Sequence, residues 1–176
     1  MRFIETPLSG AFIIDIEPIE DERGFFTTSM CETQFRDRDL EFVFKQSNIS
    51  YNYRIQTLRG MHYSSDPHQE IKLVRCTRGS IYDVIIDLRK DSKTYCEWFG
   101  TELTEGNYKT LYIPEDFAHG YITLADSSEV FYQISEVYNK KAERGVMWND
   151  PEFYINWPIE PLVMSDRDRN HPAFVR

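Results

Sequence analysis

The chain has few of the residues that mark metal knuckles, disulfide frameworks or membrane spans. Its three cysteines, Cys31, Cys76 and Cys96, are an odd number with no Cys-x-x-Cys spacing, so no zinc knuckle or disulfide framework is indicated. Reduced thiols in a cytoplasmic location are the simplest interpretation. The N-terminal segment MRFIETPLSG lacks the apolar centre of a signal peptide, and no apolar run approaches the length of a membrane span. We therefore expect no membrane association.

Positive charge is also scarce. The 176 residues include 20 Lys and Arg against 29 Asp and Glu, a formal net charge of −9. Binding to nucleic acid needs a basic surface, so nucleic acid is disfavoured as the main partner. A small phosphorylated ligand is still compatible, because a few placed arginines suffice. Neither a GxGxxG motif nor a P-loop occurs, so no nicotinamide or other nucleotide cofactor is expected.

What the chain does have is a series of short β-type runs separated by turn residues. Aromatic residues make up 15% of the chain, which favours β-structure. Evenly spaced strands predict a sandwich rather than βαβ units. We predict one all-β domain over 1–176, a cupin-type jelly roll or double-stranded β-sandwich, with a short helix at 32–40 and a helical turn near 165–168. The expected strands are 10–16, 24–30, 41–51, 57–63, 70–76, 79–88, 95–103, 109–114, 119–125 and 129–138.

The stretch LRGMHYSSDPHQEIKLVRC, residues 58–76, is the most informative one. Two β-favouring runs flank a polar loop that contains Pro67. If the two runs pair as an antiparallel hairpin about Pro67, His62 and Lys72 are directly opposite and within side-chain reach of each other. A base that titrates near neutrality and a fixed cation at one pocket indicate proton transfer with stabilisation of an anion.

The other histidines carry weaker signals. His119 follows IPEDFA at the start of a strand and is open between a site residue and a structural one, whereas His68 and His171 are interpreted as structural. The segments 62–79 and 100–119 resemble the two loose motifs of the cupins. Where metal-binding cupins carry a glutamate ligand, this chain has Lys72, whose ammonium group repels a divalent cation. We expect no metal, with His62, His68, Glu70 and His119 as a minor alternative ligand set.

Two arginines and a tyrosine also stand out. Arg59 is three residues from His62, and Arg23 lies beside Gly24 and two phenylalanines. The planar guanidinium group suits diphosphate oxygens. Alternation in EVFYQIS directs Tyr132 to the same face as Val130 and Ile134, where a core role is the simpler interpretation. Asp168 in SDRDRN is, taken alone, a helix cap or a solvated acid.

Taken together, these segments identify a resemblance over nearly the whole chain. DERGFF, FKQSN, LRGMHY, KLVRC, IPEDFAHGY, FYQISEVY, MWNDPE, INWP and SDRD occur in the order found in the dTDP-4-dehydrorhamnose 3,5-epimerase family. The resemblance implies that His62 is the catalytic base and Asp168 its orienting carboxylate. Tyr132 would be the acid on the opposite face of the sugar, and Lys72 would stabilise the enolate at the C4 oxygen.

The resemblance also implies a substrate-binding set. Its members would hold the diphosphate and the nucleoside or line the sugar site: Arg23, Gln46, Ser47, Asn48, Arg59, His119, Glu143 and Arg167. The chain departs from the family where Thr28 replaces a usual glutamate, in a shorter loop between Pro18 and Asp21, and where Asp116 replaces a commoner glycine. These departures lie near the nucleotide end or the pocket rim.

The expected function is therefore a cofactor-independent epimerase for a nucleotide-linked 4-keto-6-deoxyhexose. The substrate indicated is dTDP-4-dehydro-6-deoxy-D-glucose, with inversion at C3, C5 or both. Two alternatives stay open: a single-site epimerase for a CDP- or GDP-linked sugar, and a non-catalytic sugar-nucleotide-binding cupin. The resemblance implies a homodimer with exchange of N-terminal strands, which would cover exposed sheet edges.

Overall fold

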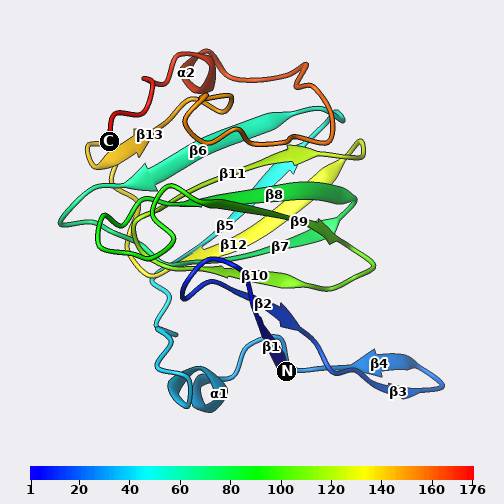
Figure 1. Ribbon diagram of the computed structural model, residues 1–176. Helices are drawn as coiled ribbons and strands as arrows, with labels where there is room; N and C mark the ends of the chain where they lie inside the picture. The colour runs from blue at the N-terminus through cyan, green and yellow to red at the C-terminus, as the bar shows by residue number, and fades with distance from the viewer.

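The computed structural model describes residues 1–176, which form two antiparallel sheets packed face to face (Figure 1). The six-stranded sheet contains, in spatial order, β1 (Arg2–Glu5), β2 (Phe12–Asp15), β10 (Thr110–Ile113), β7 (Lys72–Arg78), β12 (Ser128–Ile134) and β5 (Gln46–Asn52). The five-stranded sheet contains β13 (Glu143–Gly145), β6 (Leu58–Ser64), β11 (Phe117–Thr123), β8 (Ser80–Asp87) and β9 (Trp98–Thr104).

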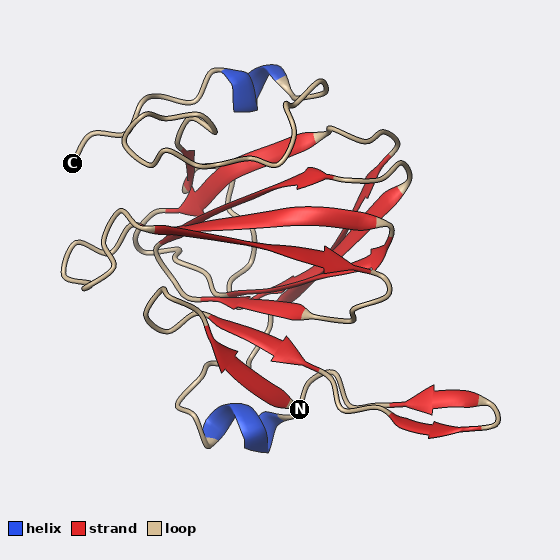
Figure 2. Cartoon of the chain, turned by 45° about the vertical axis from the view of Figure 1, so that its right-hand side comes forward, coloured by secondary structure: helices blue, strands red, loops and turns tan.

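Three smaller elements complete the chain. Strands β3 (Ile19–Asp21) and β4 (Gly24–Phe26) form a separate hairpin that projects away from the sandwich, while helices α1 (Glu32–Arg36) and α2 (Asp166–Arg169) lie at opposite ends of the molecule (Figures 1 and 2). The all-β prediction with two short helices is thus confirmed. Helix α1 is shorter than expected because Asp39 adopts a left-handed φ of 55°, which a helix cannot continue. None of the helices is long and apolar enough to cross a membrane.

Strand alternation explains the core between the sheets. Val74, Leu111 and Val130 point inward from the six-stranded sheet and pack against Ile85 and Leu103 of the five-stranded sheet. All five side chains are fully buried.

The outer faces of both sheets are covered as well. The C-terminal segment packs on the five-stranded sheet, and helix α1 with its neighbours packs on the six-stranded sheet. Strand β8 is therefore apolar on both faces, as expected for a strand covered on both sides.

The predicted hairpin over 58–76 is wrong. Strand β6 pairs with β11 and β13, whereas β7 pairs with β10 and β12, so the two strands belong to different sheets. The connection 65–71 is long enough to cross between sheets that lie about 10 Å apart. His62 and Lys72 are consequently not cross-strand partners.

The strand runs were predicted largely correctly, except that 41–45 is irregular and that β1, β3 and β13 were missed.

Gly60 permits a close approach between strands β6 and β11, and this approach positions His62. Its φ is +137°, and a Cβ at this position would lie 2.5 Å from Cα of Gly120 in the neighbouring strand β11. Only glycine combines this backbone angle with such close contact. The approach brings His62 and His119 into register as direct partners on adjacent strands.

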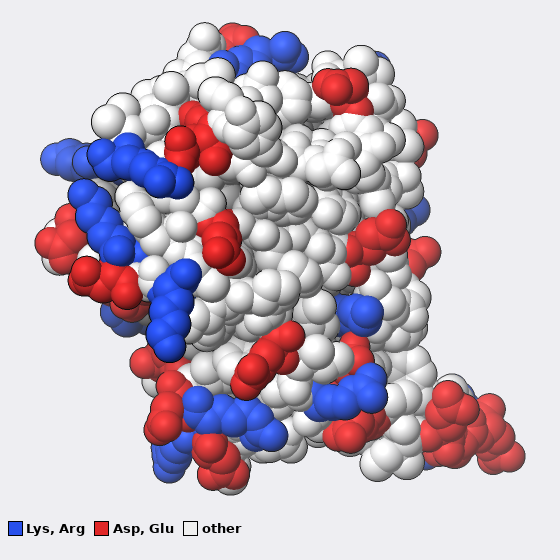
Figure 3. Space-filling view, in the orientation of Figure 1, with Lys and Arg blue, Asp and Glu red and all other residues white.

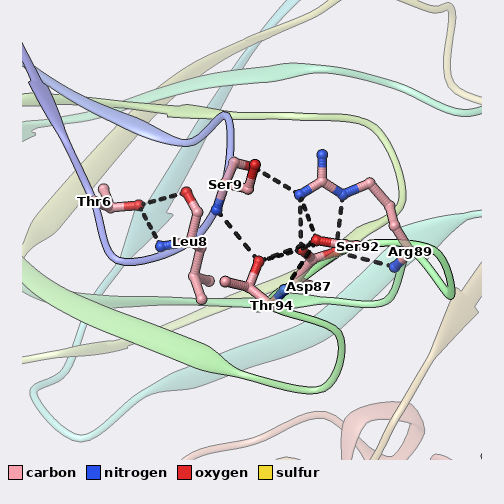
Figure 4. A network of polar contacts seen from close by, with 7 residues as sticks. All are labelled: Thr6, Leu8, Ser9, Asp87, Arg89, Ser92 and Thr94. Carbon is pink, nitrogen blue, oxygen red and sulfur yellow. Dashed lines mark hydrogen bonds and ion pairs between the residues drawn. The ribbon is translucent and has the colours of Figure 1, made fainter.

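A buried carboxylate anchors the N-terminal segment to the sandwich (Figure 4). Asp87 accepts hydrogen bonds from Arg89 Nε at 2.9 Å, from Ser92 Oγ at 2.5 Å and from Thr94 Oγ1 at 2.7 Å. Arg89 also donates to the carbonyl oxygen of Ser9 at 2.6 Å. Burial by itself would raise the pKa of Asp87, but the bonds from these three side chains outweigh it and lower the pKa.

We predict that Asp87→Asn lowers the free energy of unfolding by about 3–5 kcal/mol at neutral pH, because it leaves the Arg89 cation without its buried partner. Because the folded-state pKa is depressed, this stability is present above the unfolded-state value of about 3.9 and is lost as the pH falls through the lower folded value. Urea unfolding at several pH values measures both effects. Asp91→Asn, an exposed acid of the same loop, is the control. Equal stability of the two variants at pH 7 would contradict the assignment.

Candidate active site

A cavity of about 720 Å³ opens between the two sheets, where the C-terminal segment closes over their edge. Its walls come from three sources: β5, β7 and β12 of one sheet, β6, β11 and β13 of the other, and the segment around α2. The charged or hydrogen-bonding side chains that line it include Gln46, Asn48, Arg59, His62, Glu70, Lys72, His119, Tyr121, Tyr132, Tyr138, Glu143, Arg167 and Asp168.

His62 and Asp168 form the central contact. His62 Nε2 lies 2.8 Å from Asp168 Oδ1, although the two residues are far apart in the sequence. Ser165 caps helix α2 by accepting a hydrogen bond from the Asp168 backbone N–H, and this fixes the start of the helix. Burial would raise the pKa of Asp168, but the hydrogen bond and charge of His62 outweigh it and lower the pKa. An ionised carboxylate only accepts hydrogen bonds, so the ring donates from Nε2, and in the neutral imidazole the lone pair is then on Nδ1.

Lys72 reaches the same cavity from the opposite sheet. Its Nζ lies 2.9 Å from Glu70 Oε1, and the two side chains are only 9% and 11% exposed. His62 and Lys72 therefore face one cavity across the sandwich instead of across a hairpin. A buried ammonium group held by a carboxylate is a fixed positive charge, which suits the stabilisation of an oxyanion that forms nearby.

Tyr132 also projects into the cavity from the six-stranded sheet. Burial raises the pKa of its phenol, and the neighbouring Tyr121 hydroxyl and Glu70 carboxylate raise the pKa further. The phenol is therefore protonated at neutral pH and can donate a proton. His119 enters from the five-stranded sheet, with Nε2 3.0 Å from both carboxylate oxygens of the fully buried Asp83.

Five more of the predicted residues line the cavity: Gln46, Asn48, Arg59, Glu143 and Arg167. Gln46 donates to Asn48 Oδ1 at 2.7 Å, and Arg59 Nε donates to the amide oxygen of Asn52 at 2.8 Å. Arg167 and Glu143 form an ion pair at 2.7 Å. Arg59 thus reaches the cavity with a neutral partner, so its charge stays available for an anionic ligand.

Two of the predicted binding residues lie outside the cavity of this chain. Ser47 lies between Gln46 and Asn48 on β5, and strand alternation directs it to the other face of the sheet. Arg23 lies at the turn of the β3–β4 hairpin, where its side chain is 85% exposed and pairs with Asp21. Figure 3 shows acidic side chains gathered on this projecting hairpin, consistent with the run EDE before Arg23.

The structure adds residues that the sequence analysis did not assign. Glu70 was considered only as an alternative metal ligand, although alternation in the predicted strand 70–76 would direct it to the same face as Lys72. Asp83 lies within the apolar run of β8, and an acid in such a run indicates a buried carboxylate that needs a partner. Tyr138 donates to Glu143, and His171 lies against the His62 ring, with ring centroids 5.3 Å apart. No sequence signal pointed to His171.

Comparison with known proteins assigns the chain to a family. The family model described as dTDP-4-dehydrorhamnose 3,5-epimerase matches residues 5–176. The chain belongs to this family. The resemblance seen in the sequence is thereby confirmed. The epimerase of Methanothermobacter thermautotrophicus is 44% identical over 172 residues, which cover 96% of this chain and 92% of that protein.

Solved structures of the family share the fold. The dTDP-4-dehydrorhamnose 3,5-epimerase of Elizabethkingia anophelis aligns with a TM-score of 0.96 at 37% identity, covering 99% of this chain and 96% of that one. The enzyme of Bacillus anthracis, solved with TDP and PPi bound, aligns with a TM-score of 0.94 at 38% identity, covering 98% and 99%. The epimerase fold of these relatives is the cupin-like sandwich described above.

The buried Glu70–Lys72 pair leads to a stability prediction. Glu70→Gln or Lys72→Met alone leaves one buried charge without its partner and should cost about 3–5 kcal/mol of unfolding free energy. The double variant removes both charges and should cost less than the sum of the two. Urea unfolding of the double-mutant cycle measures the difference.

The exposed pair Lys45–Glu136, at 2.7 Å, is the matched control, and its coupling should be only about 0.2–1 kcal/mol. Additive single effects at Glu70 and Lys72 would mean that the two side chains do not act as a pair.

Proposed function

We propose that residues 1–176 form one epimerase domain that inverts C3, C5 or both in a nucleotide-linked 4-keto-6-deoxyhexose, dTDP-4-dehydro-6-deoxy-D-glucose being the substrate favoured by the family. The observation that carries the proposal is the His62–Asp168 pair, which faces the same cavity as Lys72 and Tyr132 in a member of this family. Membership in the family indicates the reaction, and the His62–Asp168 pair supplies a base suited to that reaction.

The chemistry requires a proton to leave a carbon next to the ketone and another to return from the other face. His62 Nδ1 accepts the first proton, and Asp168 stabilises the imidazolium that results. The electron pair of the broken C–H bond forms the C=C bond of the enolate, and the carbonyl π electrons move onto the C4 oxygen. There the Lys72 cation stabilises the enolate more than the neutral ketone. The reaction is redox-neutral and needs no cofactor.

The two sheets supply the two faces of the reaction. His62 comes from the five-stranded sheet, whereas Tyr132 and Lys72 come from the six-stranded sheet. A sugar bound between the sheets would therefore meet the base on one face and the phenol on the other. The raised pKa of Tyr132, caused chiefly by burial, keeps its proton available for return to carbon. Gln46, Asn48 and Arg59 would contact the nucleoside diphosphate.

We further propose a homodimer in which the β3–β4 hairpin of each chain reaches the site of its partner. The hairpin leaves the body of its own chain, and it exposes Ile19 by 72% and Phe26 by 73%, apolar surface that a second chain would cover (Figure 2). Arg23 at its turn would then bring a cation to the diphosphate from outside. A cytoplasmic location is also proposed, because all three thiols are unpaired.

Hydrogen exchange in D₂O tests the reaction. With the dTDP-linked 4-keto sugar, the wild-type protein should place deuterium at C3, C5 or both, and mass spectrometry or NMR identifies which centres are inverted. CDP- and GDP-linked sugars should exchange more slowly. His62→Ala should slow exchange by about 10²–10⁴-fold, since the general base is lost. Tyr132→Phe should retain exchange and lose net inversion.

His68→Ala serves as the control, because His68 lies in the 65–71 connection outside the cavity. Full exchange in His62→Ala would rule out His62 as the base. Tight binding of all three sugars without any exchange would favour the non-catalytic alternative.

Mixing two inactive variants tests the shared site. Arg23→Ala and His62→Ala proteins should each be impaired. After dissociation and reassembly at equal amounts, about a quarter of the sites should be intact if Arg23 acts on the partner, because half of the dimers are mixed and each contains one complete site. No recovery on mixing would show that Arg23 does not act across the dimer.

A further inference from the structure

The C-terminal segment places a second imidazole beside the His62–Asp168 pair. His171 Nε2 lies 3.5 Å from Asp168 Oδ1, and the His171 side chain is only 7% exposed. This nitrogen is buried and has no hydrogen-bond partner. A buried nitrogen with an unused hydrogen-bonding position is unusual in a folded protein and calls for an explanation.

The three side chains have the spacing of a metal site. One ligand atom from each of His62, Asp168 and His171 lies within 4.8 Å of the other two. Ligands about 2.0–2.2 Å from a tetrahedral zinc ion are separated by about 3.4 Å, close to the 3.5 Å between His171 and Asp168. The 2.8 Å between His62 and Asp168 would need to widen by about half an ångström to reach that spacing.

The backbone and the neighbouring charges accommodate a cation. A Cβ at Gly145 would lie 2.3–2.5 Å from the His171 ring, so glycine is what lets the ring lie against β13. The nearby cations are already paired, Arg167 with Glu143 and Lys72 with Glu70. No Arg or Lys forms an ion pair with Asp168, whose only ion-pair partners are the two imidazoles.

We propose that His62, Asp168 and His171 form a binding site for a divalent cation of the zinc class. Two imidazoles and one carboxylate are ligands that Zn²⁺ prefers. His62 and Asp168 line the cavity, from which water would fill a further coordination position. Two of these ligands, Asp168 and His171, come from the C-terminal segment. Lys72 and His119, the positions considered for a cupin-type metal, are not among the ligands.

Occupation of this site would remove the base, a consequence that rests on the proposed function. Metal bound at His62 Nε2 displaces the proton of that nitrogen, and the neutral ring then carries its proton on Nδ1. The lone pair that would accept the substrate proton is no longer available. The cation would therefore act as an inhibitor of the epimerase and not as its cofactor.

Zinc titration of metal-free protein tests the site directly. Calorimetry should show one Zn²⁺ bound per chain, with no competition from Mg²⁺, which prefers oxygen ligands. His171→Leu should weaken Zn²⁺ binding by at least about 10–100-fold, the loss typical of even an outer-shell partner. His68→Leu, a matched change outside the cluster, should bind Zn²⁺ as the wild-type protein does. Thermal unfolding in a chelator checks that both variants are folded.

Activity gives the second readout. Zn²⁺ should abolish deuterium exchange in the wild-type protein, whereas the same Zn²⁺ concentration should leave the exchange rate of His171→Leu at that variant's own metal-free value. Equal Zn²⁺ affinity of wild type and His171→Leu would overturn the site. Tight, His171-dependent binding that leaves exchange unaffected would overturn the inhibition. Absence of exchange in metal-free protein would contradict the proposed function and leave the binding result standing.

Discussion

The hydrogen bond between His62 and Asp168 is the contact on which the arrangement of the site depends. It joins strand β6 to helix α2 and closes a loop of 106 residues. The apolar side chains Val146, Phe153 and Phe174 pack the C-terminal segment onto the outer face of the five-stranded sheet and so bring α2 to the rim of the cavity. The Asp168 carboxylate is tolerated in this buried position because the His62 imidazole is hydrogen-bonded to it.

The charges of the cavity are paired within the chain. Lys72 lies against Glu70, Arg167 against Glu143 and His119 against Asp83, so most ionisable groups have fixed positions. Fixed charges need no reorganisation during a reaction, which is the basis of electrostatic catalysis. Arg59 is different, because its partner is an amide. In a chain of net charge −9, a local cation of this kind is what a diphosphate would require.

Local sequence patterns predict the structure of this chain wherever contacts within one strand decide it. Period-two alternation located most strands and placed Tyr132 on the inward face. The same rule, applied to β5, places Ser47 on the opposite face of the sheet from Gln46 and Asn48. The failed hairpin has another cause. Alternation determines which face a residue occupies within a strand, but it carries no information about which sheet the strand joins.

By itself, the sequence determined the β-class, the family and the chemical types that the cavity contains. It also placed the Lys72 ammonium group where a metal-binding relative would have a carboxylate. Tertiary structure alone decided that His62 and Lys72 face one cavity across the sandwich, and that Asp168 and His171 lie beside His62. These contacts join different sheets or distant segments. They depend on how the layers pack, which is set by burial of the whole core and not by any local run of residues.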